Sequence, residues 1–221
     1  MDKIQKSAIA FRNLVGKAIY TYHVSVNKRV TVFHLDFNAK DFKHAAGLHY
    51  LSDLDIPKNS ARILNWILND RNPVTDKFLS LSCHYKTSAQ DERDIPLRIT
   101  ELAYIEEYLD DSNIVYIYSP KDSPANNSLI KCDYIIESYS AERKQTVYIF
   151  IKHRSGMESN CGIVSFCVKK NTSYGGIYCY IMLKRKCKNG ISVELFRHKK
   201  YSLEQSDIIE NNLNAPQTSQ K

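Results

Sequence analysis

The second half of the chain is a succession of short β-rich segments separated by turn residues. From Asn113 onward, runs of Tyr, Ile, Val and Phe alternate with Ser-Pro, Gly and Asn-Gly pairs. Asn189-Gly190 is a strong signal for a two-residue hairpin turn. Short strands in such close succession favour antiparallel pairing, because parallel crossovers need a dozen or more residues. The expected strands are 114–118, 134–139, 146–151, 162–168, 176–183 and 191–196.

The first half reads mainly as helices around one hairpin. Apolar residues recur at helical spacing from Ile4 to Val15, and Gly16 is placed to end that helix. Segments 20–26 and 30–37 predict a hairpin, and 63–68, 75–82 and 95–109 predict further helices. This order predicts an α+β fold, with N-terminal helices and a hairpin packed against a mainly antiparallel β-sheet. We expect one domain over 1–205 and a flexible tail over 206–221.

Composition excludes several classes of protein. The chain has 221 residues, of which 43% are hydrophobic, enough to bury a core. No run approaches the length of a membrane span, and the first residues lack the apolar stretch of a signal peptide. We therefore expect a cytoplasmic protein whose six cysteines are reduced. Glycine-rich nucleotide-binding motifs and metal-protease motifs are absent, so the sequence predicts no cofactor and no metal.

Positive charge is concentrated near the end of the chain. Between Lys169 and Lys200 there are nine basic residues and one acidic residue, whereas the whole chain has a net charge of +7. A basic region on a nearly neutral body is typical of a protein that binds a polyanion. Lysines on a sheet edge also prevent aggregation, and the sequence alone does not separate these two interpretations.

Residues 41–56 carry two histidines in an apolar setting. On a helix, Phe42, Ala45, Ala46 and His49 would share one face, while His44 lies on the opposite face. Histidine titrates near neutral pH and suits proton transfer, but a core imidazole bonded to a backbone carbonyl is an equally good interpretation. Residues five apart on a helix point about 140° away from each other. We therefore expect one of the two histidines at most to transfer protons.

The same stretch resembles a known family. Ile4, Ala8, Phe11 and Leu14, followed by the box from Phe42 to Leu51 and by Asp55-Ile56, are similar to the phage barnase–EndoU–colicin–RelE-like nucleases of the fourth variety. Further similarity lies in Arg98-Ile99, Leu102, Ile105, 133–136, 148–151, Ser165-Phe166 and Tyr174.

The resemblance implies a small RNase-like fold that cuts RNA without a metal. In that chemistry the ribose 2′-OH attacks the adjacent phosphate, with a general base, a general acid and cationic stabilisation of the phosphorane. DNA lacks the attacking hydroxyl. The implied catalytic candidates are His44, His49, Ser165 and Tyr174. The implied substrate-binding candidates are Lys43, Arg98, Lys152, Lys169, Lys170 and Arg185.

Interpretations of these residues without a catalytic role stay open. Arg98 on an amphipathic helix is typical of a surface ion pair, and Ser165 and Tyr174 need no function. Val168-Lys169-Lys170 replaces the aromatic–proline step of the family, which favours an inactive nucleic-acid-binding protein of the same fold. The tyrosine-rich strands are also compatible with a protein partner. RNA is the partner we expect, and an immunity or regulatory protein is a further candidate.

Overall fold

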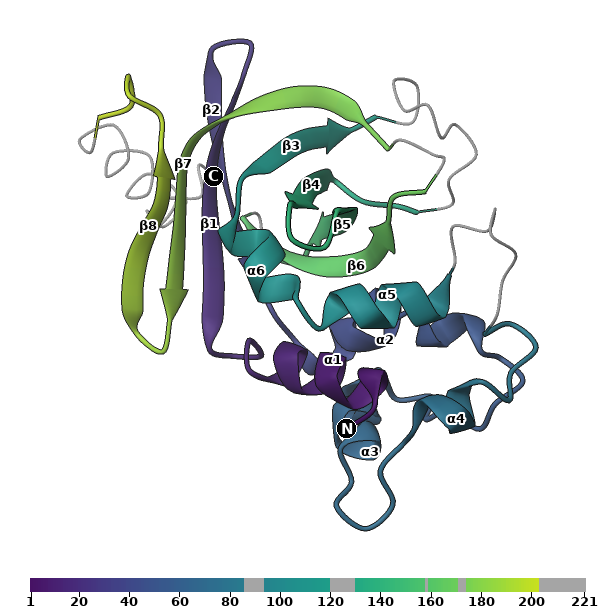
Figure 1. Cartoon of the computed structure of the whole chain (residues 1–221). Helices are drawn as coiled ribbons and strands as arrows, with labels where there is room; N and C mark the ends of the chain where they lie inside the picture. Colours follow the sequence, from purple (N-terminus) through teal and green to yellow (C-terminus); the bar gives the residue numbers. More distant parts are fainter. Residues whose placement is uncertain (86–93, 120–129, 158, 171–173, 203–221) are drawn as a thin grey trace, which may run out of the picture.

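Seven strands of the chain close into a barrel. A computed structural model of the whole chain describes residues 1–85, 94–119, 130–157, 159–170 and 174–202. Its sheet has the order β1-β2-β6-β5-β4-β3-β7-β8, and an additional pairing of β1 with β7 closes the barrel and leaves β8 outside it (Figure 1). The strands are β1 (Ala18–Val26), β2 (Arg29–Asp36), β3 (Asn113–Tyr118), β4 (Tyr134–Ser140), β5 (Gln145–His153), β6 (Asn160–Val168), β7 (Gly176–Lys188) and β8 (Ile191–Arg197).

The closed barrel corrects the expected α+β fold. The prediction of N-terminal helices and a hairpin packed against a mainly antiparallel β-sheet is wrong, because the hairpin β1–β2 is itself part of the sheet and helps to close it. β1 pairs antiparallel with β7, from Ala18 opposite Lys188 to Ser25 opposite Tyr180. β2 pairs parallel with β6 through His34 and Leu35, so the barrel is mixed. The strand segments were predicted to within two residues of their observed bounds, except that β7 continues five residues beyond the predicted end at Leu183.

The barrel interior is filled by large side chains that alternate along the strands. The rings of Tyr22 and Phe33 stack with centroids 5.0 Å apart, and Phe33 stacks on Tyr134 at 4.4 Å. Val147, Ile149 and Ile151 of β5 point into this core, so Tyr148 and Phe150 lie on the outer face of the same strand. That outer face carries a second, smaller cluster of buried side chains.

The helices are short and gather at one end of the barrel (Figure 1). The segment 95–109 is not one helix, because it divides at Ala103-Tyr104 into α5 and α6. None of the helices in the described part of the chain is long and apolar enough to cross a membrane. The helices are α1 (Lys3–Arg12), α2 (Phe42–Ala45), α3 (Ile63–Ile67), α4 (Asp76–Leu79), α5 (Ile95–Leu102) and α6 (Ile105–Asp110), with short 3-10 turns η1 (Ala39–Asp41), η2 (Leu48–Tyr50) and η3 (Ser60–Arg62).

The continuous helix expected over 41–56 is also wrong. α2 ends after four residues, and Gly47 adopts the left-handed conformation with φ 73° before η2 begins. Only glycine takes this conformation at low cost, so the chain turns there. We call residues 42–50 the histidine elbow. The predicted tail over 206–221 lies outside the described residues, and the single-domain boundary stays a prediction.

Candidate functional site

The histidine elbow brings its two imidazoles together. The rings of His44 and His49 have centroids 4.7 Å apart with planes tilted by 41°. The expectation that they diverge by about 140° rested on a continuous helix and is wrong. Gly47 is the physical reason, because its positive φ redirects the chain between the two residues. His44 is exposed and His49 is half-buried, so the pair reaches from the surface inward.

An ion-pair network fixes the start of the elbow to the barrel. The Arg154 guanidinium, which follows β5, donates from Nε to Asp36 Oδ1 and from NH2 to Asp41 Oδ2, both at 2.6 Å. Asp36 ends β2, and Asp41 immediately precedes α2. Gly162 on β6 leaves room for this guanidinium, since a Cβ there would lie 2.5 Å from Arg154 Cζ. The elbow therefore has a defined position relative to β2, β5 and β6.

Arg98 is buried beneath the elbow, and no carboxylate in the part of the chain that the structure describes pairs with it. Its side chain comes from α5, is 2% exposed, and donates from NH2 to Cys167 Sγ at 3.2 Å. The guanidinium also lies 5.7 Å from the centroid of the Tyr50 ring. Its Nε and NH1 have no hydrogen-bond partner among the residues that the structure describes. A buried charge left unsatisfied in this way is costly to the fold.

Two other enclosed arginines show how this chain normally satisfies a guanidinium. Arg143 contacts Glu101 at 3.2 Å and Glu107 at 2.9 Å, and its side chain is 15% exposed. Arg154, 16% exposed, holds Asp36 and Asp41. Arg98 is more deeply buried than either. Its uncompensated charge therefore distinguishes the site beneath the elbow from the structural ion pairs elsewhere.

Burial of the rings and nearby positive charges lower the pKa values of both histidines. Burial, the neighbouring His44 and the Arg98 guanidinium lower the pKa of His49 to about 4. Burial and then Lys43 lower the pKa of His44 from its ordinary value. Both imidazoles are consequently held toward the neutral form near pH 7, in which one ring nitrogen carries a lone pair that can accept a proton.

The Nδ1 atom of His49 is enclosed. It is buried and has no hydrogen-bond partner within the described residues. Hydrogen bonding to the Lys43 backbone opposes the lowering of the His49 pKa without reversing it.

Ser165 and Tyr174 lie on the same outer face as Arg98. Ser165 Oγ is 3.7 Å from Cys167 Sγ, the atom that Arg98 contacts. Tyr174 packs edge-on against Tyr148 and Phe150, with ring centroids 5.2 and 4.9 Å apart. Tyr148 stands opposite Cys167 in the pairing of β5 and β6. Three residues that the family resemblance implied, Arg98, Ser165 and Tyr174, are therefore joined through one layer of side chains.

The predicted lysines are divided between free and engaged positions. Lys152 is exposed on β5. Lys43 Nζ donates to the Pro57 carbonyl at 3.0 Å, and Lys170 Nζ donates to Asp94 at 2.7 Å. Lys169 lies 3.6 Å from the Glu137 carboxylate. These contacts fix loops and strand ends, so the engaged lysines are less available to a ligand than the sequence implied.

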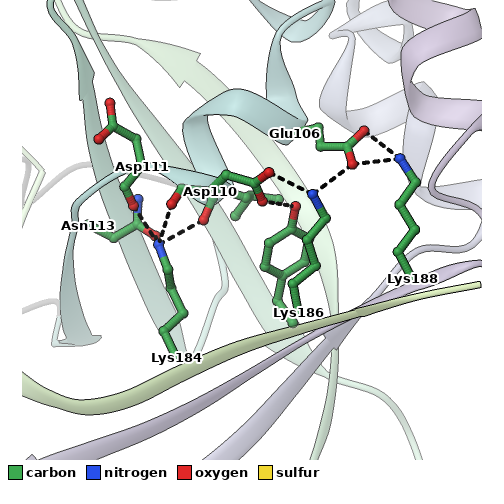
Figure 2. A network of polar contacts seen from close by, with 9 residues as sticks. Glu106, Asp110, Asp111, Asn113, Lys184, Lys186 and Lys188 are labelled. Carbon is green, nitrogen blue, oxygen red and sulfur yellow. Dashed lines mark hydrogen bonds and ion pairs between the residues drawn. The ribbon is translucent and has the colours of Figure 1, made fainter. Parts of the chain in front are cut away.

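The lysine-rich strand β7 directs lysine side chains toward acidic residues and carbonyl groups of α6 and the residues that follow it (Figure 2). Lys184 is buried and donates to the carbonyl of Leu109 at 2.9 Å and to Asn113 at 3.0 Å. Lys186 and Lys188 contact Glu106 at 2.8 and 2.7 Å. β7, which also carries Arg185, is separated from β6 by β2 and β1 on one side of the barrel and by β5, β4 and β3 on the other. The basic stretch is therefore largely used within the fold.

Sequence reasoning missed the residues that connect the site. Cys167 appeared as one thiol in an apolar strand, and Tyr50 as one of fifteen tyrosines. Gly47 lies between the two histidines and was a signal for the turn that brings them together, since a glycine there favours a turn over a continuous helix.

A group of potential metal ligands lies elsewhere. In the described parts of the chain, the residues whose ligand atoms come close enough are Asp53, Cys83 and His84, all exposed. Asp53 already accepts from the Ser82 hydroxyl and from the Cys83 backbone, which account for its lowered pKa of about 2. His44 and His49 are not part of this group.

The fold and site together define a β-barrel protein that presents paired imidazoles above a buried guanidinium. The chain matches the family described as phage-Barnase-EndoU-ColicinE5/D-RelE like nuclease4 over residues 3–212, and it belongs to that family. The predicted resemblance is thereby confirmed, and the chain is a phage-associated nuclease of this type. No curated protein and no solved structure matches the chain.

Proposed function

We propose that the chain is an endoribonuclease that cuts RNA at the histidine elbow by attack of the ribose 2′-OH, without a metal. The observation that carries the proposal is the buried Arg98 guanidinium beside the His44–His49 pair, whose Nε and NH1 have no partner among the described residues. A phosphate supplies the anionic oxygens that such a guanidinium lacks, and planar donors match phosphate geometry.

The two histidines divide the proton transfers. His44 is exposed and held toward the neutral form, so it takes the proton of the 2′-OH. The oxygen then attacks phosphorus, and the 5′ oxygen leaves as it gains a proton. His49 donates that proton, because a bound phosphate raises the pKa of a neighbouring imidazole and loads it. Arg98 stabilises the charge that develops on the phosphorane.

A second candidate function is supported by one observation. The unpaired atoms of Arg98 and of His49 are enclosed, so substrate reaches them only if the elbow moves. A protein whose elbow stays closed would bind RNA at the surface and leave it intact. Ser165 and Tyr174 remain in either case proposed residues for orienting phosphate oxygens through the Cys167 layer.

The test is cleavage of labelled RNA in the presence of a chelator by the wild type and by His44→Ala, His49→Ala and Arg98→Met. The exposed His84→Ala is the matched control. We expect wild type and control to cut in chelator, and the three site variants to lose activity by at least about 100-fold, as removal of acid–base groups does. Binding with no cleavage by any protein supports the second candidate. Cleavage that needs a divalent metal contradicts the proposed mechanism.

A further inference from the structure

A depression of about 470 Å³ lies directly beside His44. Its lining residues come from the end of η1, the histidine elbow, the start of η3 and β6. The lining residues include Lys40, Asp41, His44, Asn59, Ala61 and Val164. The proton transfers proposed above use His44 and leave the rest of this depression without a role.

The chemistry of the depression suits a flat heteroaromatic ring. Half-buried Val164 offers an aliphatic surface, while Asn59 and Ser60 add an amide and a hydroxyl to the lining. Asn59 Oδ1 already accepts from the Ala61 backbone at 3.0 Å, so the Nδ2 hydrogens are the donors that this side chain can offer to a ligand. Apolar pockets with a few directional polar groups are typical of small-ligand sites, and amides read nucleobase edges.

The charges around the depression are compatible with binding of an anionic nucleotide. Asp41 also lines it, but this carboxylate is held by Arg154 at 2.6 Å, which offsets its negative charge. Lys40 is exposed at the rim and is free to approach a phosphate oxygen. An anionic ligand therefore meets one available cation and no uncompensated carboxylate among the lining residues.

We propose that this depression is the nucleobase subsite for the nucleotide next to the scissile phosphate. The base lies on Val164, Asn59 Nδ2 donates to an acceptor on its edge, and Lys40 contacts the neighbouring phosphate. The inference rests on the proposed function, since His44 acts on the sugar of the same nucleotide. In this proposal the subsite determines which base the nuclease prefers.

The test measures binding of the four nucleoside 3′-monophosphates by calorimetry, with inorganic phosphate as the reference ligand. Ala61→Phe fills the depression, since Ala61 is an exposed lining residue. Asn59→Asp keeps an oxygen that caps η3 but removes the amide donor. Asn65→Phe is the matched control, because Asn65 lines a depression of about 490 Å³ that shares no residue with the first.

We expect Ala61→Phe to weaken nucleotide binding about tenfold with phosphate binding unchanged, and Asn59→Asp to alter the order of preference among the four bases. Asn65→Phe should bind like wild type. Equal nucleotide affinities in wild type and Ala61→Phe would overturn the subsite even if RNA is cut. Nucleotide binding that is sensitive to Ala61→Phe, in a protein that does not cut RNA, supports the subsite and overturns only the proposed catalysis.

Discussion

Gly47 and Arg98 interlock at the centre of the candidate site. A Cβ built on Gly47 would lie 3.2 Å from Arg98 Cδ and 3.3 Å from its NH1, and Gly47 has a φ of 73°. The glycine thus serves two purposes, because it turns the elbow and lets the guanidinium pass beneath it. The position of the two imidazoles depends on both.

Gly47→Ala is therefore expected to cost more than backbone strain alone. The positive φ costs about 1–2 kcal/mol in any non-glycine residue, and the contact with Arg98 adds to it. Gly156→Ala is the matched control, because Gly156 has a φ of 78° but nothing within 4 Å of its built Cβ. Denaturant unfolding should show a larger loss for Gly47→Ala. Equal losses would mean that Arg98 and the elbow are not interlocked.

Arg98→Met and Arg154→Met should change stability very differently. Removing Arg154 leaves Asp36 and Asp41 without their partner and should lower the free energy of unfolding by about 3–5 kcal/mol. Arg98 has no carboxylate partner in the described chain, so methionine should be tolerated to within about 1 kcal/mol or should stabilise the fold. Nuclease activity should nevertheless be lost in Arg98→Met. A severe loss of stability in Arg98→Met would instead assign this arginine a structural role.

The lowered pKa of His49 predicts how stability varies with pH. The unfolded ring has a pKa near 6.5 and the folded ring about 4, so the unfolded state binds more protons between these values. The contribution is fully present above about pH 6.5 and falls as the pH drops toward 4. Because the ring is partly open to solvent, we expect a change of only about 1–2 kcal/mol. His49→Gln should flatten the pH profile of unfolding, and the exposed His84→Gln should leave it unchanged.

The lysines of β7 should contribute to the stability of the fold and not to RNA binding. Burial lowers the pKa of Lys184 to about 8, and its Nζ satisfies carbonyl groups at the end of α6. Lys184→Met should cost about 2–4 kcal/mol, since these acceptors lose their donor. Lys186→Gln should leave the salt dependence of RNA affinity unchanged, whereas Lys40→Gln should reduce its slope by about one. The reverse result would restore the basic strand as the RNA-binding surface.

The sequence predicted most elements of the fold but not the closure of the strands into a barrel. Alternating and turn-bounded segments identified each strand, and Asn189-Gly190 forms the predicted hairpin with positive φ values of 52° and 80°. Barrel closure depends on Ala18 meeting Lys188, and on a short parallel contact at Leu35. Local patterns carry no information on which distant edges will pair, so the hairpin was expected to pack against the sheet and not to complete it.

The site was predicted only in part, because its geometry also depends on contacts between distant segments of the chain. The two histidines and Arg98 were singled out, but their relationship was not. Helical spacing treats His44 and His49 as divergent, and the amphipathic position of Arg98 favours a surface ion pair. Tertiary contacts with Tyr50 and Cys167 enclose the guanidinium, and such contacts join segments far apart in the chain. Charge density alone likewise did not reveal that α6 would take up the lysines of β7.

The most direct test of the account uses a DNA oligonucleotide that contains a single ribonucleotide, incubated with the protein in a chelator. The proposed chemistry predicts one cut, immediately after the ribonucleotide, with mass spectra of a 2′,3′-cyclic phosphate on one product and a 5′-hydroxyl on the other. His44→Ala should yield neither product. Cutting at the deoxynucleotides, or products with a 5′-phosphate, would contradict attack by the 2′-OH at the histidine elbow.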